Sequence, residues 1–428
     1  MNCIARFKFW GLTAVASMAV ACGSQVSDPY NPSDPLQYRV HYLVELLPGD
    51  GSAKVSMRVS QSGGLLRELT MPVGASYSQL QGDGHLETGD STIRWQPPAN
   101  GGQLSWQVHI PNRRNGDGYD AWLGVDFGLF RAEDIIPRAA SRTLKGASSE
   151  SWISFQLPAA WSVVTQYFND NGQIRIDNPE RRFDQPTGWI VAGDLGVRRE
   201  HIAGMSVAVA GPVDHAVRRM DTLGLLHWTV PELARLIPEL PPRLTIVSAG
   251  DPMWRGGLSA PQSLFLHAER PLISENATST LLHELMHMTL GLRARDGYDW
   301  IVEGLAEYYS LQLLHRSGTI SSTRYATAIA DLSEWATQAE NLCAPASTGA
   351  TTALAVGVLA SLNDEIVNTT DGDASLDEVA RELWQFDGEI DATVLEDAVE
   401  AVTGNKPDAL HSTRLPGCRT IAPANQAP

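Results

Sequence analysis

The 428-residue sequence is poor in basic residues. It has 32 Lys and Arg residues against 49 Asp and Glu residues, which gives a formal net charge of -17 at pH 7. A field of this sign repels the phosphates of nucleic acids and the headgroups of anionic lipids. The composition therefore argues against a nucleic-acid-binding protein, while the length and 43% hydrophobic content favour two domains.

Long apolar runs are also lacking. The run Phe9–Val20 follows Arg6 and Lys8 and precedes small residues, which is the pattern of an export signal rather than of a stable membrane span. The second run, ALAVGVLASL from residue 353, is too short to cross a bilayer and predicts a buried core helix.

The first segment, residues 1–22, ends in Ala19-Val20-Ala21-Cys22, which resembles the lipobox of bacterial lipoprotein signal peptides. This resemblance implies that Cys22 is lipidated and becomes the mature N-terminus, and that the lipid is the protein's only attachment to a membrane. Gly23, where an aspartate would retain a lipoprotein at the inner membrane, implies the outer membrane. An ordinary cleaved signal is the alternative. Residues 23–35 are polar and proline-rich, which predicts a linker.

Cysteine is scarce as well, with only four residues: Cys3, Cys22, Cys343 and Cys418. The first is lost with the predicted signal and the second would carry lipid, so Cys343 and Cys418 remain to pair in an oxidising compartment. Such a disulfide would hold the C-terminal tail. Two buried, unpaired thiols are the alternative, because sequence alone does not determine pairing.

The chain changes its hydrophobic period near residue 212. Residues 36–212 contain short alternating runs between Gly, Pro, Asn and Asp clusters, which predict an antiparallel β-sandwich-like domain. Residues 213–428 combine helical periodicity with two short strand-like runs and are mostly helical beyond residue 275. The predicted fold class is therefore α+β, with a β-rich domain followed by a mainly helical one.

The stretch TLLHELMHMTLG at residues 280–291 carries the strongest chemical signal. Asn276 is the predicted N-cap of a helix that ends at Gly291. His283 and His287 are four residues apart, so both imidazoles lie on one helix face and can reach one metal ion. Glu284 lies about 100° around the helix and can stand beside the metal as a base. The alternative is a structural histidine pair that makes buried hydrogen bonds.

A second predicted helix, beginning at Asp299 as N-cap and ending at Gly318, supplies two further carboxylates. Glu303 and Glu307 are four residues apart on one face. A catalytic zinc site needs three protein ligands and one open position, and Glu303 is the predicted third ligand. Glu307 is then placed to bind the far nitrogen of a ligating histidine, with His283 preferred. The alternative for both glutamates is a solvated or salt-bridged surface.

These two helices resemble those of the gluzincin metallopeptidases. HELMH followed by W-I-V-E-G-L-A-E-Y-Y at residues 300–309 is similar to the W-x-x-E-G-x-x-x-Y-Y signature of the glycyl aminopeptidase family. The resemblance implies a thermolysin-like catalytic domain behind a β-domain, a peptide or protein substrate, and one Zn²⁺ per chain held by His283, His287 and Glu303. It also implies that Glu284 is the general base of peptide hydrolysis, by an aminopeptidase or by an enzyme that cuts internally.

The sequence departs from that family at one catalytic element. The family carries a transition-state-stabilising tyrosine in a Y-x-K-G element, but the matching stretch here reads ALAVGVLA. Tyr308 and Tyr309 are the candidate replacements, followed by Tyr298 and Tyr325, and packing aromatics are the alternative for each. The departure keeps a second hypothesis open, that of an inactive relative which binds peptides or proteins at the cell envelope.

The segment WRGGLSAPQSLFLHAER at residues 254–270 resembles the edge strand that lines the cleft in these enzymes. The resemblance implies that backbone groups of Gly256, Gly257 and Leu258 pair with an extended peptide. A plain hairpin without a binding role is the alternative.

Overall fold

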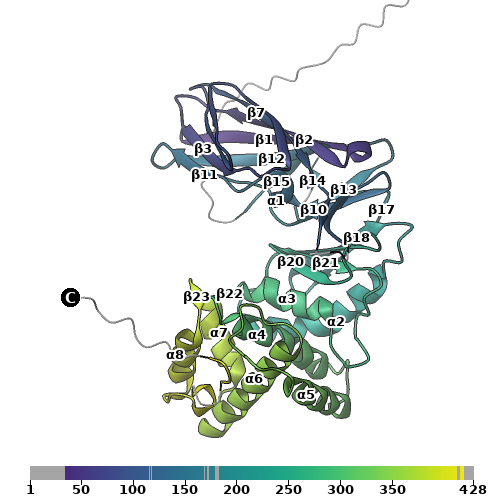
Figure 1. The fold of residues 1–428 in the computed structure, drawn as a ribbon, viewed down its shortest axis with the longest axis vertical. Coiled ribbons are helices and arrows are strands. Elements are labelled where there is room, and N and C mark those ends of the chain that lie inside the picture. The colour runs from purple at the N-terminus through teal and green to yellow at the C-terminus, as the bar shows by residue number, and fades with distance from the viewer. Residues whose placement is uncertain are drawn as a thin grey trace, which may run out of the picture.

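The computed structural model describes residues 34–114, 116, 118–167, 169–170, 173–178, 183–411 and 415–418, with β-sheets in the N-terminal half and helices in the C-terminal half (Figure 1). The predicted signal peptide, Cys22 and nearly all of the predicted linker lie outside the described residues. The α+β class expected from the sequence is confirmed.

The N-terminal half is built on two sheets that enclose one core. The core side chains alternate with exposed ones along β1, where Tyr38, Val40 and Tyr42 are buried. The larger sheet has the order β14 (Asn169–Asp170), β15 (Gln173–Ile176), β12 (Ser148–Gln156), β1 (Gln37–Leu47), β2 (Ser52–Ser60), β7 (Gly101–His109) and β4 (Tyr77–Gly82). The smaller has the order β11 (Ala140–Thr143), β3 (Leu66–Pro72), β6 (Thr92–Gln96) and β5 (His85–Thr88). Pairing is antiparallel except between β1 and β12, which are parallel because the long connection between them allows a crossover.

A third sheet joins this sandwich to the rest of the molecule. Its order is β13 (Ser162–Val164), β16 (Trp189–Gly193), β10 (Phe127–Arg131), β9 (Tyr119–Leu123) and β8 (Asn112–Arg113), and the short helix α1 (Ala132–Ile135) follows β10. Trp189 and Val191 of this sheet pack against Val247 and Phe265 of the next one.

The fourth sheet has the order β17 (Leu195–Ile202), β18 (Met205–Pro212), β19 (Arg243–Ala249), β21 (Ser263–His267) and β20 (Gly257–Ala260). Its strands β18, β19 and β21 are parallel, and β20 is an antiparallel edge strand. The predicted boundary at residue 212 divides this sheet, because β18 pairs with β19. Local periodicity could not reveal that pairing, because β18 precedes α2 in the sequence and β19 follows it.

Helices α2 (Arg219–Leu236) and α3 (Thr280–Leu290) cover the other face of the fourth sheet. The remaining helices pack on these two or on one another: α4 (Asp299–Arg316), α5 (Ser322–Ala336), α6 (Ala350–Thr369), α7 (Leu376–Gln385) and α8 (Ala392–Thr403). A small pair of strands, β22 (Arg293–Ala294) and β23 (Glu389–Ile390), lies among them. Helices α4 and α6 pack so closely at Gly304 that a Cβ on this residue would lie 2.8 Å from the Cβ of Ala355. Ser375 and Glu378 form a capping box at the start of α7.

The apolar run near residue 353 lies in α6. The whole helix has 20 residues and, by length and composition only, could cross a membrane. Val356, Leu359 and Leu362 are nevertheless buried in the core that α6 shares with α4 and α5, as expected for a core helix.

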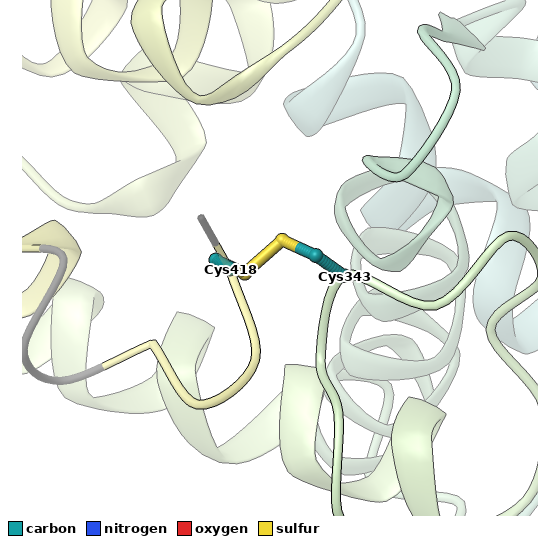
Figure 2. Close-up of a disulfide and its surroundings, with 2 residues drawn as sticks. All are labelled: Cys343 and Cys418. Carbon is teal, nitrogen blue, oxygen red and sulfur yellow. A yellow bond between two sulfur atoms is a disulfide. The ribbon is translucent and has the colours of Figure 1, made fainter. Parts of the chain in front are cut away.

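Cys343 and Cys418 form a disulfide that ties the C-terminal end of the described chain to the segment before α6 (Figure 2). Their Cα atoms are 4.9 Å apart. The backbone N–H of Leu342 donates to the carbonyl of Pro416 over 2.9 Å, so a hydrogen bond joins the same two segments beside the disulfide.

Candidate active site

Helix α3 is mostly apolar but carries two histidines and one glutamate. Its N-cap is Ser279 rather than the predicted Asn276, because the Ser279 hydroxyl accepts from the N–H of Leu282. Gly291 ends the helix in the left-handed conformation, as its φ of 63° requires. The buried residues of α3 hold it against the sheet and α4, which leaves His283, Glu284 and His287 only partly covered.

His283, His287 and Glu303 converge at one point. The Nε2 atoms of His283 and His287 are 3.0 Å apart. On α4, Oε2 of Glu303 lies 3.3 Å from Nε2 of His283, and its Oε1 lies 3.3 Å from Nε2 of His287. The side chain of Glu303 is 27% exposed and each histidine side chain 17%, so the cluster lies at the surface of a cavity rather than inside the core.

This donor set fits a zinc ion. The three candidate ligand atoms all lie within 4.8 Å of one another. Ordinary zinc–ligand bonds of about 2.0 to 2.1 Å put neighbouring donors of a tetrahedral site about 3.3 Å apart, close to the observed separations. Two imidazole nitrogens and one carboxylate are also the donor types of a known class of catalytic zinc site.

Glu307 fixes the orientation of His283. Its Oε2 atom lies 2.9 Å from Nδ1 of His283, so Glu307 orients the ring with Nε2 toward Glu303 and His287, and in the neutral ring a proton on Nδ1 leaves the lone pair of Nε2 available to a metal ion. The predicted position of Glu307 behind His283 is therefore the one that the structure shows.

The two carboxylates create a site that favours positive charge. Burial by itself lowers the pKa of His283, but Glu303 and Glu307 outweigh burial and raise it to about 10. Burial by itself raises the pKa of Glu303, but the two imidazoles outweigh it and lower the pKa to about 2. A divalent cation at this position would also compensate the negative charge of the two carboxylates.

Glu284 faces the edge strand β20. A Cβ added to Gly257 would lie 3.0 Å from Cγ of Glu284 and 2.6 Å from Cγ2 of Thr280. A glycine is therefore needed where β20 passes α3, and Glu284 lines the same cavity as His283, His287 and Glu303.

The three residues predicted to bind substrate along this strand differ in their surroundings. The carbonyl of Gly256 accepts from the N–H of His267 over 2.9 Å, and Gly256 does not line the cavity. The carbonyl of Leu258 accepts from Nε1 of Trp189. Because hydrogen-bonded and open positions alternate along an antiparallel ladder, Gly257 and Ser259 direct their backbone groups to the open edge. The open edge of β20 therefore belongs to Gly257 and Ser259 and not to the predicted Gly256 and Leu258, while pairing with a peptide stays a prediction.

The cluster opens into a cavity of about 820 Å³. Sequence patterns did not indicate that Arg114, Ser347 and Thr348 line it. Asp299 is the first residue of α4 and not, as predicted, its N-cap, which is Tyr298. Its side chain lines the cavity instead, and its Oδ2 accepts from the N–H of Ser347 over 2.7 Å. No local signal marks these residues, because they come from segments far apart in the chain.

The tyrosines proposed as transition-state stabilisers do not reach the cavity. Tyr308 and Tyr309 are 3% and 0% exposed and pack against each other in the helical core. Tyr325 stacks on His315 and accepts from Nε2 of Gln312. Among the described residues that line the cavity there is no tyrosine, so the predicted role of Tyr308 and Tyr309 is wrong. They follow Glu303 on α4 by five and six residues, and these offsets place them on faces of the helix other than the one that carries Glu303.

No family model matches the sequence, and no curated protein sequence matches it. Solved structures match the fold. An aminopeptidase N family protein from Idiomarina loihiensis is 18% identical with a TM-score of 0.62, over 86% of this chain and 76% of that one. Aminopeptidase A from Legionella pneumophila, in complex with aspartic acid, is 13% identical with a TM-score of 0.55, over 91% of this chain and 50% of that one. Yeast LTA4 hydrolase in complex with bestatin is 14% identical with a TM-score of 0.54, over 90% of this chain and 68% of that one. These likenesses show a shared fold.

Proposed function

We propose that this chain is a zinc-dependent peptidase. The observation that carries the proposal is the convergence of His283, His287 and Glu303, with Glu307 behind one histidine, at a cavity bordered by an open strand edge. These three residues would hold the ion. Names of the structural neighbours, two aminopeptidases and a hydrolase, support the same class of reaction.

Zinc bound there would supply Lewis acidity, making water more acidic and polarising a substrate carbonyl. The chain's own residues do the rest. Glu284, beside the cluster, takes the proton of the attacking water and passes it to the leaving amine. Glu307 accepts from Nδ1 of His283 and so favours the tautomer of the neutral ring whose Nε2 can bind the ion. Gly257 and Ser259 offer backbone donors and acceptors to an extended peptide, which positions the scissile bond.

Removal of N-terminal residues is the finer activity that we propose, on the strength of the aminopeptidase neighbours. A second candidate function is a peptide- or protein-binding relative without turnover. The observation that favours it is the absence of tyrosine among the described residues that line the cavity, since a hydroxyl there would stabilise an oxyanion.

The test uses the purified chain in two forms, wild type and Glu284→Gln. Elemental analysis should find one zinc per chain in both, because Glu284 is not among the three converging ligands. Mass spectrometry of a peptide library should show cleavage by the wild type and a loss of about 10²- to 10⁴-fold in the variant. Zinc without any cleavage would favour the binding protein, and absence of stoichiometric zinc would refute the zinc peptidase.

We further propose that the protein is anchored to the outer membrane through lipid on Cys22 and acts on peptides or proteins of the cell envelope. The signal-like residues 1–22 support this location. Cys22→Ala should move the protein from the membrane fraction to the soluble fraction, and a variant that stays with the membranes would contradict the lipid anchor.

A further inference from the structure

The N-terminal half contributes a cation to the cavity. Arg114, which follows β8, is the one Lys or Arg among the described residues that line it. The other charged lining residues, apart from the histidines, are the carboxylates Glu284, Asp299 and Glu303. A single guanidinium in such a cavity attracts an anionic group of a ligand and repels an ammonium group.

The backbone around Arg114 is fixed to the segment that leads into β20. Its N–H donates to the carbonyl of Gly118 over 2.9 Å. The N–H of Tyr119 donates to Pro252, and the N–H of Trp254 donates to Tyr119, each over 3.0 Å. A Cβ on Gly118 would lie 2.8 Å from the backbone of Trp254, so a glycine permits this approach. The hairpin of the N-terminal half is therefore held against the strand that borders the cavity.

The guanidinium itself is held by two contacts. It lies over the ring of Trp254, with Cζ 4.0 Å from the ring centroid. Its Nη1 donates to Oδ1 of Asp120 over 3.2 Å. Trp254 in turn packs on Gly256, where a Cβ would lie 2.1 Å from the ring. The Arg114 side chain is still 39% exposed, and a guanidinium has five N–H donors, so donors remain for a ligand.

We infer that Arg114 is a specificity-determining residue that receives a carboxylate of the peptide substrate. The inference rests on the proposed peptidase function and adds the substrate class: peptides with an Asp or Glu side chain, or a C-terminal carboxylate, beside the scissile bond. A peptide paired along Gly257 and Ser259 would lie in the cavity that the Arg114–Trp254 stack also lines. The fork of N–H groups matches a carboxylate and discriminates against the neutral amide of the same shape.

The experiment compares matched peptides that differ in one group. One pair carries Glu or Gln next to the cleaved bond with an amidated C-terminus, and the other pair carries a free or an amidated C-terminus without acidic side chains. Each is measured with wild type, Arg114→Gln, Arg114→Lys and Arg113→Gln. Arg113 is the matched control, since it neighbours Arg114, is exposed and does not line the cavity.

Wild type should prefer the acidic member of at least one pair by about tenfold in kcat/KM, the effect of one charged hydrogen bond. In Arg114→Gln this preference should fall to about one, mainly through KM, with the neutral peptides changed less than about threefold. Arg114→Lys should retain part of the preference, and Arg113→Gln all of it. The pair that shows the preference identifies the side chain or the C-terminus as the source of the carboxylate.

Equal rates for acidic and neutral peptides in wild type, or equal losses for both in Arg114→Gln, would overturn the inference. Binding of fluorescent versions of the same peptides to Glu284→Gln, followed by anisotropy, tests it without turnover. If wild type cleaves no peptide, the peptidase proposal fails, while Arg114-dependent binding of the acidic peptide would still support the carboxylate site. Binding that does not distinguish the two peptides would refute that site.

Discussion

The Nδ1 atom of His283 lies 2.9 Å from Oε2 of Glu307, and the two residues belong to different helices, α3 and α4. Glu303, one turn before Glu307 on the same face of α4, contacts the opposite nitrogen of the same imidazole. One face of α4 thus contacts both nitrogens of His283. Glu307 orients the ring through Nδ1, and Nε2 is the nitrogen that faces Glu303 and the proposed metal position.

Loss of Glu307 should weaken metal binding without removing a ligand. Glu307→Ala leaves Nδ1 of His283 without its acceptor, so the proton position and ring orientation are no longer fixed. We expect zinc affinity to fall by about 10- to 100-fold, and by less in Glu307→Gln, whose amide oxygen still accepts. A competitive titration with a chromophoric chelator measures this change. Glu382→Gln, an exposed carboxylate on α7, is the control, and unchanged affinity in Glu307→Ala would contradict the proposed role.

Substitution of Gly257 should impair turnover while zinc stays bound. The new methyl group of Gly257→Ala would lie 2.6 Å from Thr280 and 3.0 Å from Glu284, so the strand or the catalytic carboxylate must move. A shift of about 1 Å at a reacting group costs on the order of 10²-fold in rate. Steady-state kinetics and elemental analysis test both parts. Gly224→Ala, on the exposed face of α2 with nothing within 4 Å, should instead raise stability by about 0.5 to 1 kcal/mol.

Removal of the disulfide should destabilise the helical half. Cys343 and Cys418 are 75 residues apart, and the chain-entropy account gives about 4 kcal/mol for a loop of this length. The Cys343→Ser, Cys418→Ser double variant should therefore unfold at lower urea concentration than oxidised wild type. Wild type treated with a reductant should match the variant. A reductant that shifts the variant too would point to an effect unrelated to this bond.

Stability should fall as the pH drops below neutrality. His267 on β21 is 1% exposed, and burial lowers its pKa from the ordinary 6.5, with Asp251 opposing the shift. The unfolded chain therefore takes up the proton first, so the stability that neutral His267 contributes is present above about pH 6.5 and is lost as the pH falls toward the lower pKa of the folded state. His41 and His215 act in the same direction.

Urea unfolding at pH 7.5 and pH 5.5 measures this loss. In His267→Asn the loss should be smaller, although the smaller side chain lowers stability at both pH values. The asparagine oxygen can still accept from the N–H of Glu269, as Nδ1 of His267 does. An undiminished pH dependence in the variant would assign the effect to other groups.

Local sequence determined much of the candidate site. The four-residue spacings of His283 with His287 and of Glu303 with Glu307 place each pair on one helix face, because 3.6 residues form one turn. The alternating pattern of β1 likewise determined which side chains form the core of the β-rich half. These features depend on a few neighbouring residues and can be derived without knowing the rest of the chain.

Only the tertiary structure decided what surrounds those donors. It placed Arg114 on Trp254, paired β18 with β19 across α2, and turned Tyr308 and Tyr309 into the core instead of the cavity. Each of these outcomes depends on contacts between distant segments, and such contacts are set by the packing of whole sheets and helices. Hydrophobic periodicity and helical spacing determine the direction in which a side chain leaves its own helix or strand. They do not determine which other helix or strand it will contact.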